Sequence, residues 1–359
     1  MTLILSNDDV EKLLTMPECI AALEEAYVEL AEGRGVTRTR SDCITPTTQP
    51  DAVYGLKSMD GVIPKLGIGA IRINSDIVTF PKRGNNVRRE KVPAAPNGRY
   101  CGLVLLFSTE NGEPLAILPD GVMQRMRVGA TNGLGVKYLA RRDATSVGIL
   151  GSGWQAGTQL MALKAVRPIR AIKVYSPTRE HAERFAEEMT DTLQLEVRCV
   201  ASAEEAVRDV DIAVTSTNSR VPFFPAEWFQ PGMHLSCMQR DEATDACFTL
   251  ADVVVFHTRA RERNYTSRDF AATEERHGFE IRDHQYPRDL DWNAYPDLGE
   301  LVTGQVPGRT SAAQRTLFLN SIGVGAQFAA VGHHVYRLAR ERGLGHEIPI
   351  DWFVESVHP

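Results

Sequence analysis

Hydrophobic positions change their spacing along the chain, and each spacing predicts a different kind of element. Residues 16–33 carry apolar side chains at helical spacing, ending at glycine. Residues 36–120 instead predict strands, including AIRINSDIV and CGLVLLFST, and STENGEPLAIL predicts a hairpin with a tight Asn111–Gly112 turn. Between these strands, FPKRGNNVRREKVPAAPNGR is basic and interrupted by Pro and Gly, which predicts a loop.

From residue 145 onward, apolar strands and amphipathic helices alternate. SVGIL, AIKVYS, LEVRCV and DIAVTST predict strands, and QAGTQLMALKAV, REHAERFAEEMT and SAEEAVRDV predict the helices between them. PGMHLSCM and ADVVVFH follow as strands, and TLFLNSIGVGAQFAAVGHHVYRLARERG predicts a helix that ends near Gly343. This alternation is typical of βαβ units, so the expected fold is α/β with a Rossmann-type, doubly wound parallel sheet.

Composition narrows the function classes. Of 359 residues, 43% are hydrophobic and 24% charged, and the formal charge of −6 argues against a nucleic-acid binder. No apolar run approaches the roughly 20 residues that span a bilayer, and the start does not resemble a signal peptide. Six scattered cysteines without a CxxC pair, and nine histidines without HExxH, predict a cytoplasmic protein with no metal site.

A glycine-rich turn follows the strand SVGIL. Gly151, Gly153 and Ala156 match the G-x-G-x-x-G/A fingerprint of dinucleotide-binding folds, with Trp154 and Gln155 between them. Glycine permits the tight turn and the approach of a pyrophosphate, which then lies on the N-terminus of the next helix. The alternative is a turn that needs glycine for packing alone.

The end of the second strand of this unit bears on the choice of nucleotide. NAD-binding sheets usually have an acidic residue there, whereas this chain has Ser176, Thr178 and Arg179 before the first acid, Glu180. Hydroxyls and a guanidinium suit a 2′-phosphate, which favours NADP(H) over the alternative NAD(H). Arg179 is otherwise an ordinary solvated residue.

A second polar stretch follows a later strand. Thr215, Ser216 and Thr217 end DIAVTST at the carboxyl edge of the sheet, where ligands bind in this architecture. Their hydroxyls either line the cofactor pocket or cap the next turn.

Several blocks in order resemble the ornithine cyclodeaminase/μ-crystallin family. These are YGLKSMDG, GEPLAILPDG with RMRVGATNGLG, GILGSGWQAG, PGMHLSCMQRD, and LGELVTGQVPGRT with LFLNSIG. The resemblance implies a dinucleotide-binding domain over 137–319, and a mixed α/β domain over 1–136 and 320–359 that binds substrate and forms a homodimer. It also implies a nicotinamide cofactor and small α-amino or α-imino acid substrates.

The resemblance also implies site residues. The substrate-binding positions correspond to Arg40 (or its neighbour Arg38), Lys57 and Arg127, and an alternative alignment places Arg72 where the family has its lysine. The catalytic positions correspond to Lys57 and Asp241. In LFLNSIG, Ser321 falls at a cofactor-binding position and Asn320 replaces a lysine often found there.

Three functions fit these residues. The first is an NAD(P)H-dependent ketimine reductase or amino-acid dehydrogenase, in which arginines hold the substrate carboxylate while Lys57 and Asp241 assist proton transfer. The second is a cyclodeaminase that uses NAD⁺ catalytically and releases ammonia. The third is a cofactor-dependent ligand-binding protein without turnover.

A basic segment follows the predicted strand AIRINSDIV. It either binds a second acidic group of the substrate or is simply solvated. Its residues are Lys82, Arg83, Arg88, Arg89 and Lys91.

Overall fold

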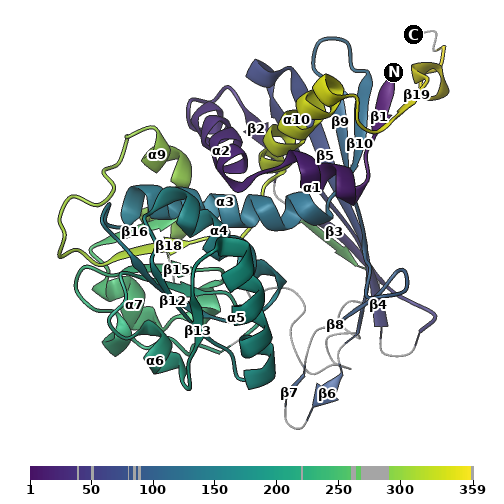
Figure 1. Ribbon diagram of the computed structural model, residues 1–359. Helices are drawn as coiled ribbons and strands as arrows, with labels where there is room; N and C mark the ends of the chain where they lie inside the picture. Colours follow the sequence, from purple (N-terminus) through teal and green to yellow (C-terminus); the bar gives the residue numbers. More distant parts are fainter. Residues whose placement is uncertain are drawn as a thin grey trace.

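The structure is a computed structural model with two large β-sheets and a small two-stranded one, β6-β7 (Figure 1). It describes residues 1–38, 40–49, 52–79, 81–83, 86–87, 90–219, 221–259, 264–267 and 291–356; the side chains of 82–83, 86–87 and 264–267 are not described. Arg88 and Arg89 of the basic segment therefore lie outside the described residues.

A mixed sheet is built mainly from both ends of the chain, with β17 (Asn264–Ser267) added at one edge. Its strand order is β17-β3-β4-β5-β9-β10-β1-β19, with β2 paired to β4 and β8 to β5. The first and last of the described strands pair with each other, so the two chain ends close one edge. The bounds are β1 (Thr2–Ile4), β2 (Val36–Thr37), β3 (Ser41–Pro46), β4 (Ala52–Ile63), β5 (Ile68–Thr79), β8 (Glu90–Val92), β9 (Cys101–Ser108), β10 (Pro114–Pro119), β17 (Asn264–Ser267) and β19 (His346–Ile348).

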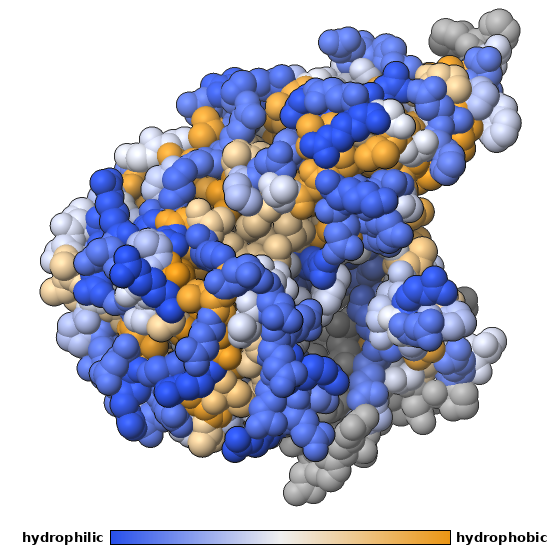
Figure 2. All heavy atoms as spheres, viewed as in Figure 1, coloured by the Kyte–Doolittle hydropathy of each residue, from blue (hydrophilic) through white to orange (hydrophobic). Residues whose placement is uncertain are grey.

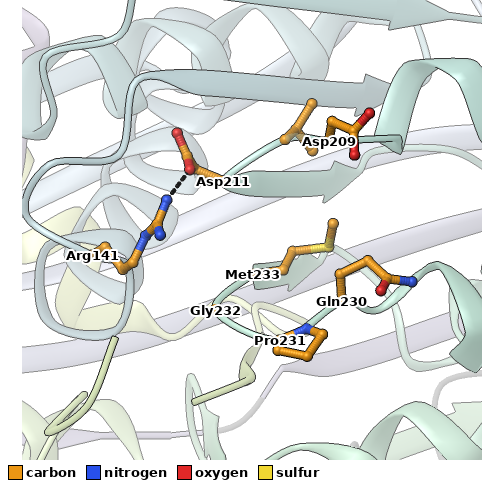
Figure 3. Close-up of a pocket in the computed structure, with 8 residues that line it drawn as sticks. Arg141, Asp209, Asp211, Gln230, Pro231, Gly232 and Met233 are labelled. Atoms are coloured by element: carbon orange, nitrogen blue, oxygen red, sulfur yellow. Dashed lines mark hydrogen bonds and ion pairs between the residues drawn. The ribbon is translucent and has the colours of Figure 1, made fainter. Parts of the chain in front are cut away.

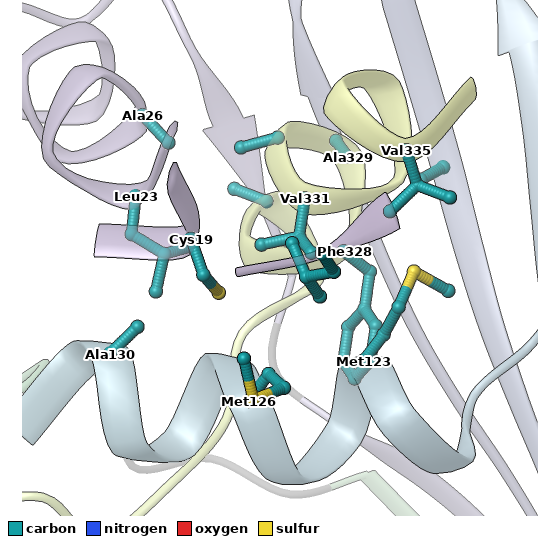
Figure 4. Close-up of a cluster of buried hydrophobic side chains, with 14 of the residues drawn as sticks. Cys19, Leu23, Ala26, Met123, Met126, Ala130, Phe328, Ala329, Val331 and Val335 are labelled. Carbon is teal, nitrogen blue, oxygen red and sulfur yellow. The ribbon is translucent and has the colours of Figure 1, made fainter. Parts of the chain in front are cut away.

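Helices cover one face of this sheet. They are α1 (Asn7–Leu13), α2 (Met16–Ala31), α3 (Gly121–Leu139) and α10 (Gly325–Arg342). Figure 4 shows their shared core, in which side chains of α2, α3 and α10 point toward one another: Cys19, Leu23, Ala26, Met123, Met126, Ala130, Phe328, Ala329, Val331 and Val335. Burying this apolar surface is the main force that fixes the helices on the sheet.

The second sheet is parallel throughout, with the order β13-β12-β11-β14-β15-β18-β16. This confirms the α/β, Rossmann-type expectation. Its strands are β11 (Ser146–Leu150), β12 (Ala171–Tyr175), β13 (Val197–Cys199), β14 (Ile212–Thr215), β15 (His234–Cys237), β16 (Val253–Phe256) and β18 (Thr316–Leu319). Its helices are α4 (Trp154–Val166), α5 (Arg179–Leu193), α6 (Ala203–Val207), α7 (Asp245–Leu250) and α9 (Leu298–Val302).

Three local predictions are wrong. The segment predicted as one helix to Gly343 begins instead with the strand β18, whose four residues are all buried between β15 and β16. An apolar strand covered on both faces does not alternate, so its pattern resembles a buried helix. The hairpin turn spans 109–113, with Gly112 at φ +77°, and is not a two-residue turn. The predicted basic loop contains the short strands β6 (Lys82–Arg83), β7 (Asn86–Val87) and β8.

Hydrophilic residues cover most of the face in Figure 2, and apolar residues are exposed in smaller patches among them. Within the described part of the chain, no helix is long and apolar enough to span a membrane. The same residues contain no group of three His, Cys, Asp or Glu side chains arranged to hold a metal ion.

Candidate functional site

The glycine-rich turn between β11 and α4 has the geometry of a nucleotide cradle. Gly151 has φ +114°, and a Cβ there would collide with the carbonyl oxygen of Ser216. Gly153 is the N-cap of α4, and a Cβ built on it meets no atom within 4 Å. The space beside Gly153 and the free N–H groups of the first turn therefore fit a pyrophosphate. Ala156 is fully buried, which lets α4 pack closely on the sheet.

The end of β12 carries no carboxylate before α5. Ser176 is half-buried, while Thr178 precedes α5 as its N-cap. The Arg179 side chain is 76% exposed and donates to Glu183 one turn later at 2.7 Å. The hydroxyls and the guanidinium lie on one short segment, and the guanidinium is held loosely by an exposed pair.

A buried carboxylate fixes the loop that follows β14. Glu242 is fully buried and accepts hydrogen bonds from Thr215 Oγ1 (2.8 Å), Thr217 N (2.6 Å) and Gln239 N (2.9 Å). Thr217 Oγ1 donates as well, at 2.7 Å. Burial raises the pKa of Glu242 while these donors lower it. Glu242 thus joins the polar loop to the short helix η3 (Arg240–Glu242), in which Asp241 is half-buried.

The helix-covered face of the mixed sheet changes from apolar to charged along β4 and β5. Lys57 is buried and donates to Asp76 Oδ2 at 2.6 Å, while Lys91 of β8 lies 2.8 Å from Asp76 Oδ1. Burial raises the pKa of Asp76, but the two lysines outweigh it and hold that pKa below its usual range. Two cations therefore share one buried carboxylate.

Two arginines converge on one aromatic ring of α10. Arg72 of β5 forms an ion pair with Asp120, with Nε 2.8 Å from Oδ2. The guanidinium carbons of Arg72 and Arg127 lie 5.6 and 5.2 Å from the centre of the Phe328 ring. This arrangement places Arg72, the alternative to Lys57 for the family's lysine, beside Arg127.

Arg127 of α3 is buried, and its described hydrogen bonds go to amide oxygens. Nη1 donates to Gln327 Oε1 at 2.9 Å and Nη2 to Gln124 Oε1 at 2.8 Å, while its Nε has no described partner. Burial, and then the positive charge of Arg72, lower the pKa of Arg127 to about 9. A buried guanidinium in these surroundings gains much from an anion.

A buried network of polar side chains orients the Gln327 amide that accepts a hydrogen bond from Arg127. Gln327 Nε2 donates to Tyr27 Oη at 2.9 Å and to Thr131 Oγ1 at 2.7 Å, and lies 3.4 Å from His257 Nε2. Burial, and then Arg127, lower the pKa of His257 to about 3, so the ring is neutral at neutral pH. The network fixes the Gln327 amide with its oxygen toward Arg127.

The remaining predicted residues lie apart from Arg72 and Arg127. Arg40 forms a bidentate pair with buried Asp42, whose register partner across β3 and β4 is Lys57. Its rival Arg38 is exposed and paired with Asp60. Ser321 follows β18 and is half-buried, beside Asn320, which donates to the Val128 carbonyl at 3.0 Å. Asp241 lies at the carboxyl edge of the parallel sheet, not on the sheet that carries Lys57.

Helix α3 connects the two halves of the candidate site. Arg125, two residues before Arg127, lies 5.9 Å from the ring of Trp154, which is 56% exposed at the start of α4. Gly129 of α3 packs directly on the backbone of Thr158 in α4. The arginine pair is therefore anchored to the helix that begins at the glycine turn.

Sequence reasoning missed the partners of the charged residues. Asp76, Asp120, Glu242 and Gln327 pair with residues 15 to 300 positions away, apart from local bonds of Glu242 and Gln327. No local pattern identifies such partners. The sequence predicted AIRINSDIV, which contains Asp76, as a strand, but it did not identify Asp76 as the partner of Lys57.

The pocket in Figure 3 is separate from this site. It has a volume of about 200 Å³ and is lined by Arg141, residues 209–211 and residues 230–233. These residues precede β14 and β15, at the amino edge of the parallel sheet, and Asp211 forms an ion pair there with Arg141. Ligands of such sheets bind at the opposite, carboxyl edge.

Comparison with known proteins agrees with this geometry. The model of the ornithine cyclodeaminase/mu-crystallin family matches residues 1–343. The chain is 27% identical, over 96% of its length and 99% of the relative's, to a Delta(1)-pyrroline-2-carboxylate reductase of Bacillus cereus. The corresponding Thermococcus litoralis enzyme, solved with NADH and L-proline, has a TM-score of 0.77 at 28% identity, covering 97% of this chain and 100% of that one.

A second solved structure is an archaeal alanine dehydrogenase dimer with bound NAD. Its TM-score is 0.75 at 26% identity, with 97% of this chain and 99% of that chain covered. Since the family model spans nearly the whole chain, this protein belongs to the ornithine cyclodeaminase/mu-crystallin family.

Proposed function

We propose that this protein is a nicotinamide-dependent oxidoreductase that reduces small α-imino acids, or oxidises the matching α-amino acids, at the α-carbon. The observation that carries the proposal is Arg127, a buried guanidinium paired with Arg72 across Phe328 and joined through α3 to the glycine turn. The relatives of this protein named above are a reductase of an imino acid and a dehydrogenase of an amino acid, and the two solved structures contain NADH or NAD.

The substrate carboxylate binds Arg127, with Arg72 beside it. A carboxylate satisfies the Arg127 Nε and compensates its buried charge, and the planar fork fixes the carboxylate's orientation. Arg40 and Lys57 line the same sheet further along, where ion pairs with Asp42 and Asp76 hold their side chains in place. The α-carbon is then held in one position relative to the nicotinamide.

A nicotinamide bound at the glycine turn would supply a hydride to the α-carbon. The two electrons convert the substrate C=N bond to C–N, and the nitrogen ends as an amine after gaining a proton. Asp241, at the carboxyl edge of the parallel sheet, is our candidate for exchanging protons with this nitrogen. Lys57, which already donates to Asp76, acts here as a substrate-binding cation rather than a proton donor.

The dinucleotide is held by the glycine turn, by residues 176–179 after β12 and by the 215–217 loop after β14. Gly151, Gly153 and Ala156 seat the pyrophosphate, with Trp154 and Gln155 over it, and the 215–217 loop with Ser321 lines the nicotinamide side. NADP(H) is the preferred form, because Ser176, Thr178 and Arg179 offer donors and no competing acid. Replacing Ser176 with Asp should reverse the ratio of kcat/KM for NADPH to that for NADH.

One assay separates the three functions. The protein is offered NADPH or NADH with pyrroline-2-carboxylate or piperideine-2-carboxylate, and in parallel NAD⁺ with ornithine. Oxidation of the cofactor with the imines supports the reductase. Ammonia and proline formed from ornithine without net cofactor change would establish a cyclodeaminase instead. Substrate binding by calorimetry with no turnover in any arm would favour a ligand-binding protein.

The uncovered face of the mixed sheet supports a homodimer. Side chains alternate along β4, β5 and β9, so the face opposite the helices carries Leu56, Val62, Ile71, Ile73, Leu103, Leu105 and Phe107. Four of these, Leu56, Val62, Leu103 and Phe107, are exposed large hydrophobic residues. An exposed, largely apolar sheet face of this kind is expected to pack on a second copy of the chain.

A further inference from the structure

Glu242 is a buried carboxylate whose two oxygens each accept two hydrogen bonds. Oε1 accepts from the backbone N–H and the hydroxyl of Thr217, at 2.6 and 2.7 Å. Oε2 accepts from the hydroxyl of Thr215 at 2.8 Å and from the backbone N–H of Gln239 at 2.9 Å. A hydroxyl can also accept a hydrogen bond, but a backbone N–H only donates. One backbone donor therefore faces each oxygen, so both positions require an acceptor, as a carboxylate provides.

These donors belong to two segments with different proposed roles. Residues 215–217 end and follow β14 and are proposed to line the nicotinamide side, whereas Gln239 precedes η3, which contains Asp241. Because β14 and β15 are parallel neighbours, both segments lie at the carboxyl edge of the sheet. The Gln239 side chain donates to the Thr217 carbonyl at 3.4 Å, and the other described hydrogen bonds from Thr217 to η3 end on Glu242.

Asp241 lies between two anchored neighbours. On one side, the guanidinium carbon of buried Arg240 is 4.0 Å from the centre of the Phe248 ring. On the other side is Glu242, with its four donors. Asp241 itself is half-buried. The place of Asp241 relative to the 215–217 loop therefore depends on the bonds that Glu242 makes.

We propose that Glu242 is a positioning residue for proton transfer: it fixes Asp241 relative to the 215–217 loop, and so relative to the nicotinamide. This inference rests on the proposed function, in which Asp241 exchanges protons with the substrate nitrogen. Such an exchange needs a heavy-atom distance of about 2.6–3.2 Å, and a displacement of ~1 Å can slow a reaction about 100-fold. Arg72 and Arg127, proposed to bind the substrate carboxylate, have their described hydrogen bonds elsewhere, so substrate affinity should depend little on Glu242.

The test is Glu242→Gln, in which an NH₂ group replaces one acceptor oxygen. Whichever way the amide is turned, its NH₂ faces the backbone N–H of either Thr217 or Gln239, so the two segments are pushed apart. With the nucleotide and imine that the unaltered protein uses best, we expect kcat to fall at least about tenfold. KM for the imine, and the dissociation constant of the nucleotide from Trp154 fluorescence, should each change less than about threefold.

A double-mutant cycle shows whether Glu242 acts through Asp241. Because Asp241→Asn removes the proton-exchanging carboxylate, Glu242→Gln should lower kcat less than about twofold further in that background. Multiplicative losses would mean that the two residues act independently, which overturns the inference. An unchanged kcat in either single variant overturns it as well, while the oxidoreductase proposal stands. If the unaltered protein reduces no imine, the proposed function and the inference both fail.

Two further variants separate positioning from stability. Glu29→Gln alters another buried carboxylate, which pairs with Arg34 at the end of α2, and should lower Tm while leaving kcat unchanged. A loss of kcat as large as that of Glu242→Gln would instead assign the effect to stability. Thr215→Val removes one of the four donors with little change of shape, and should lower kcat about threefold. If circular dichroism shows Glu242→Gln to be unfolded, an unchanged kcat in Thr215→Val overturns the inference.

Discussion

At the scale of single residues, Arg127 couples function to stability. Because its folded pKa of about 9 lies below the ordinary value, burying it charged destabilises the protein below pH 9. Arg127→Met removes this charge and keeps a similar volume. We expect Tm to stay level or rise, while kcat/KM falls about 100-fold or more through loss of the carboxylate contact.

The control for Arg127→Met is Arg208→Met, which removes an exposed arginine paired with Glu204 on α6. That variant should retain both Tm and kcat/KM. Thermal unfolding and steady-state kinetics measure the two quantities separately. A large drop in Tm with unchanged kcat/KM in the Arg127 variant would assign Arg127 to stability and not to substrate binding.

His257 makes stability depend on pH in the acid range. Its folded pKa is about 3 and its unfolded pKa is near 6.5, so between these values the unfolded chain binds more protons. The free energy of unfolding therefore falls as pH decreases below 6.5, by at most ~1.4 kcal/mol per pH unit from this residue. His257→Gln should reduce that slope, measured by denaturant unfolding at several pH values between 6.5 and 4.5.

A substitution of an exposed histidine tests whether the change in this slope is specific to His257. His181 lies on the surface of α5, and His181→Gln should leave the pH dependence unchanged. Buried His234, whose pKa also lies well below its ordinary value through burial, remains in both variants and contributes equally. The interpretation fails if the two substitutions change the slope to the same degree.

Sequence alone identified residue types at the site better than it identified their partners. Asp241 was selected, whereas its neighbour Glu242 is the one buried among four donors. Alternation along β4 could place Lys57 inside, but its pairing with Asp76 depends on strand register. The bond from Arg127 to Gln327 joins helices 200 residues apart and follows from tertiary packing alone.

At the scale of elements, the two glycines of the turn between β11 and α4 have different roles. We expect Gly151 to be needed for folding and Gly153 for binding of the dinucleotide. Gly153→Ala places a methyl group in open space at φ −83°, so stability should hold or rise by ~0.4–1 kcal/mol. The same methyl group occupies the place proposed for the pyrophosphate, so dinucleotide affinity should fall at least about tenfold. Thermal unfolding and titration of Trp154 fluorescence measure the two effects.

Gly151→Ala should behave differently. Its positive φ and the collision with the Ser216 carbonyl destabilise the turn itself, so Tm and dinucleotide affinity should both fall. If Gly153→Ala bound NADPH and NADH as tightly as the unaltered protein, the turn would not hold the pyrophosphate.

The elements themselves were predicted where their patterns were unambiguous. The end of helix α10 was predicted correctly, because the helix ends at Arg342 and its C-cap Gly343 lies in the left-handed region. Strand β18 was missed because TLFL is buried on both faces and lacks alternation. Its position between β15 and β16 is out of chain order and depends on which apolar faces remain to be covered. The local spacing of apolar residues does not encode that position.

At the scale of the whole molecule, the apolar outer face of β4, β5 and β9 determines the proposed assembly. Leu103→Lys introduces a charge at the centre of this face, and its side chain stays solvated in a monomer. In a dimer packed through the face, the same ammonium would be buried without a partner, at a cost of several kcal/mol. We therefore expect a dimer for the unaltered chain and a monomer for Leu103→Lys in light scattering coupled to size exclusion.

Circular dichroism establishes that the Leu103 variant is folded, and Val221→Lys is its matched control. Val221 is an exposed apolar residue outside the mixed sheet, so a lysine there should leave the dimer intact. A folded Leu103→Lys protein that remains dimeric would exclude this face as the interface. Because Leu103 and Ile73 are register partners and Ile73 adjoins Arg72 on β5, loss of the dimer should also loosen the strands that carry Arg72, Lys57 and Asp76. We expect substrate affinity to decrease in the monomer while dinucleotide affinity is retained, since the glycine turn lies on the other sheet.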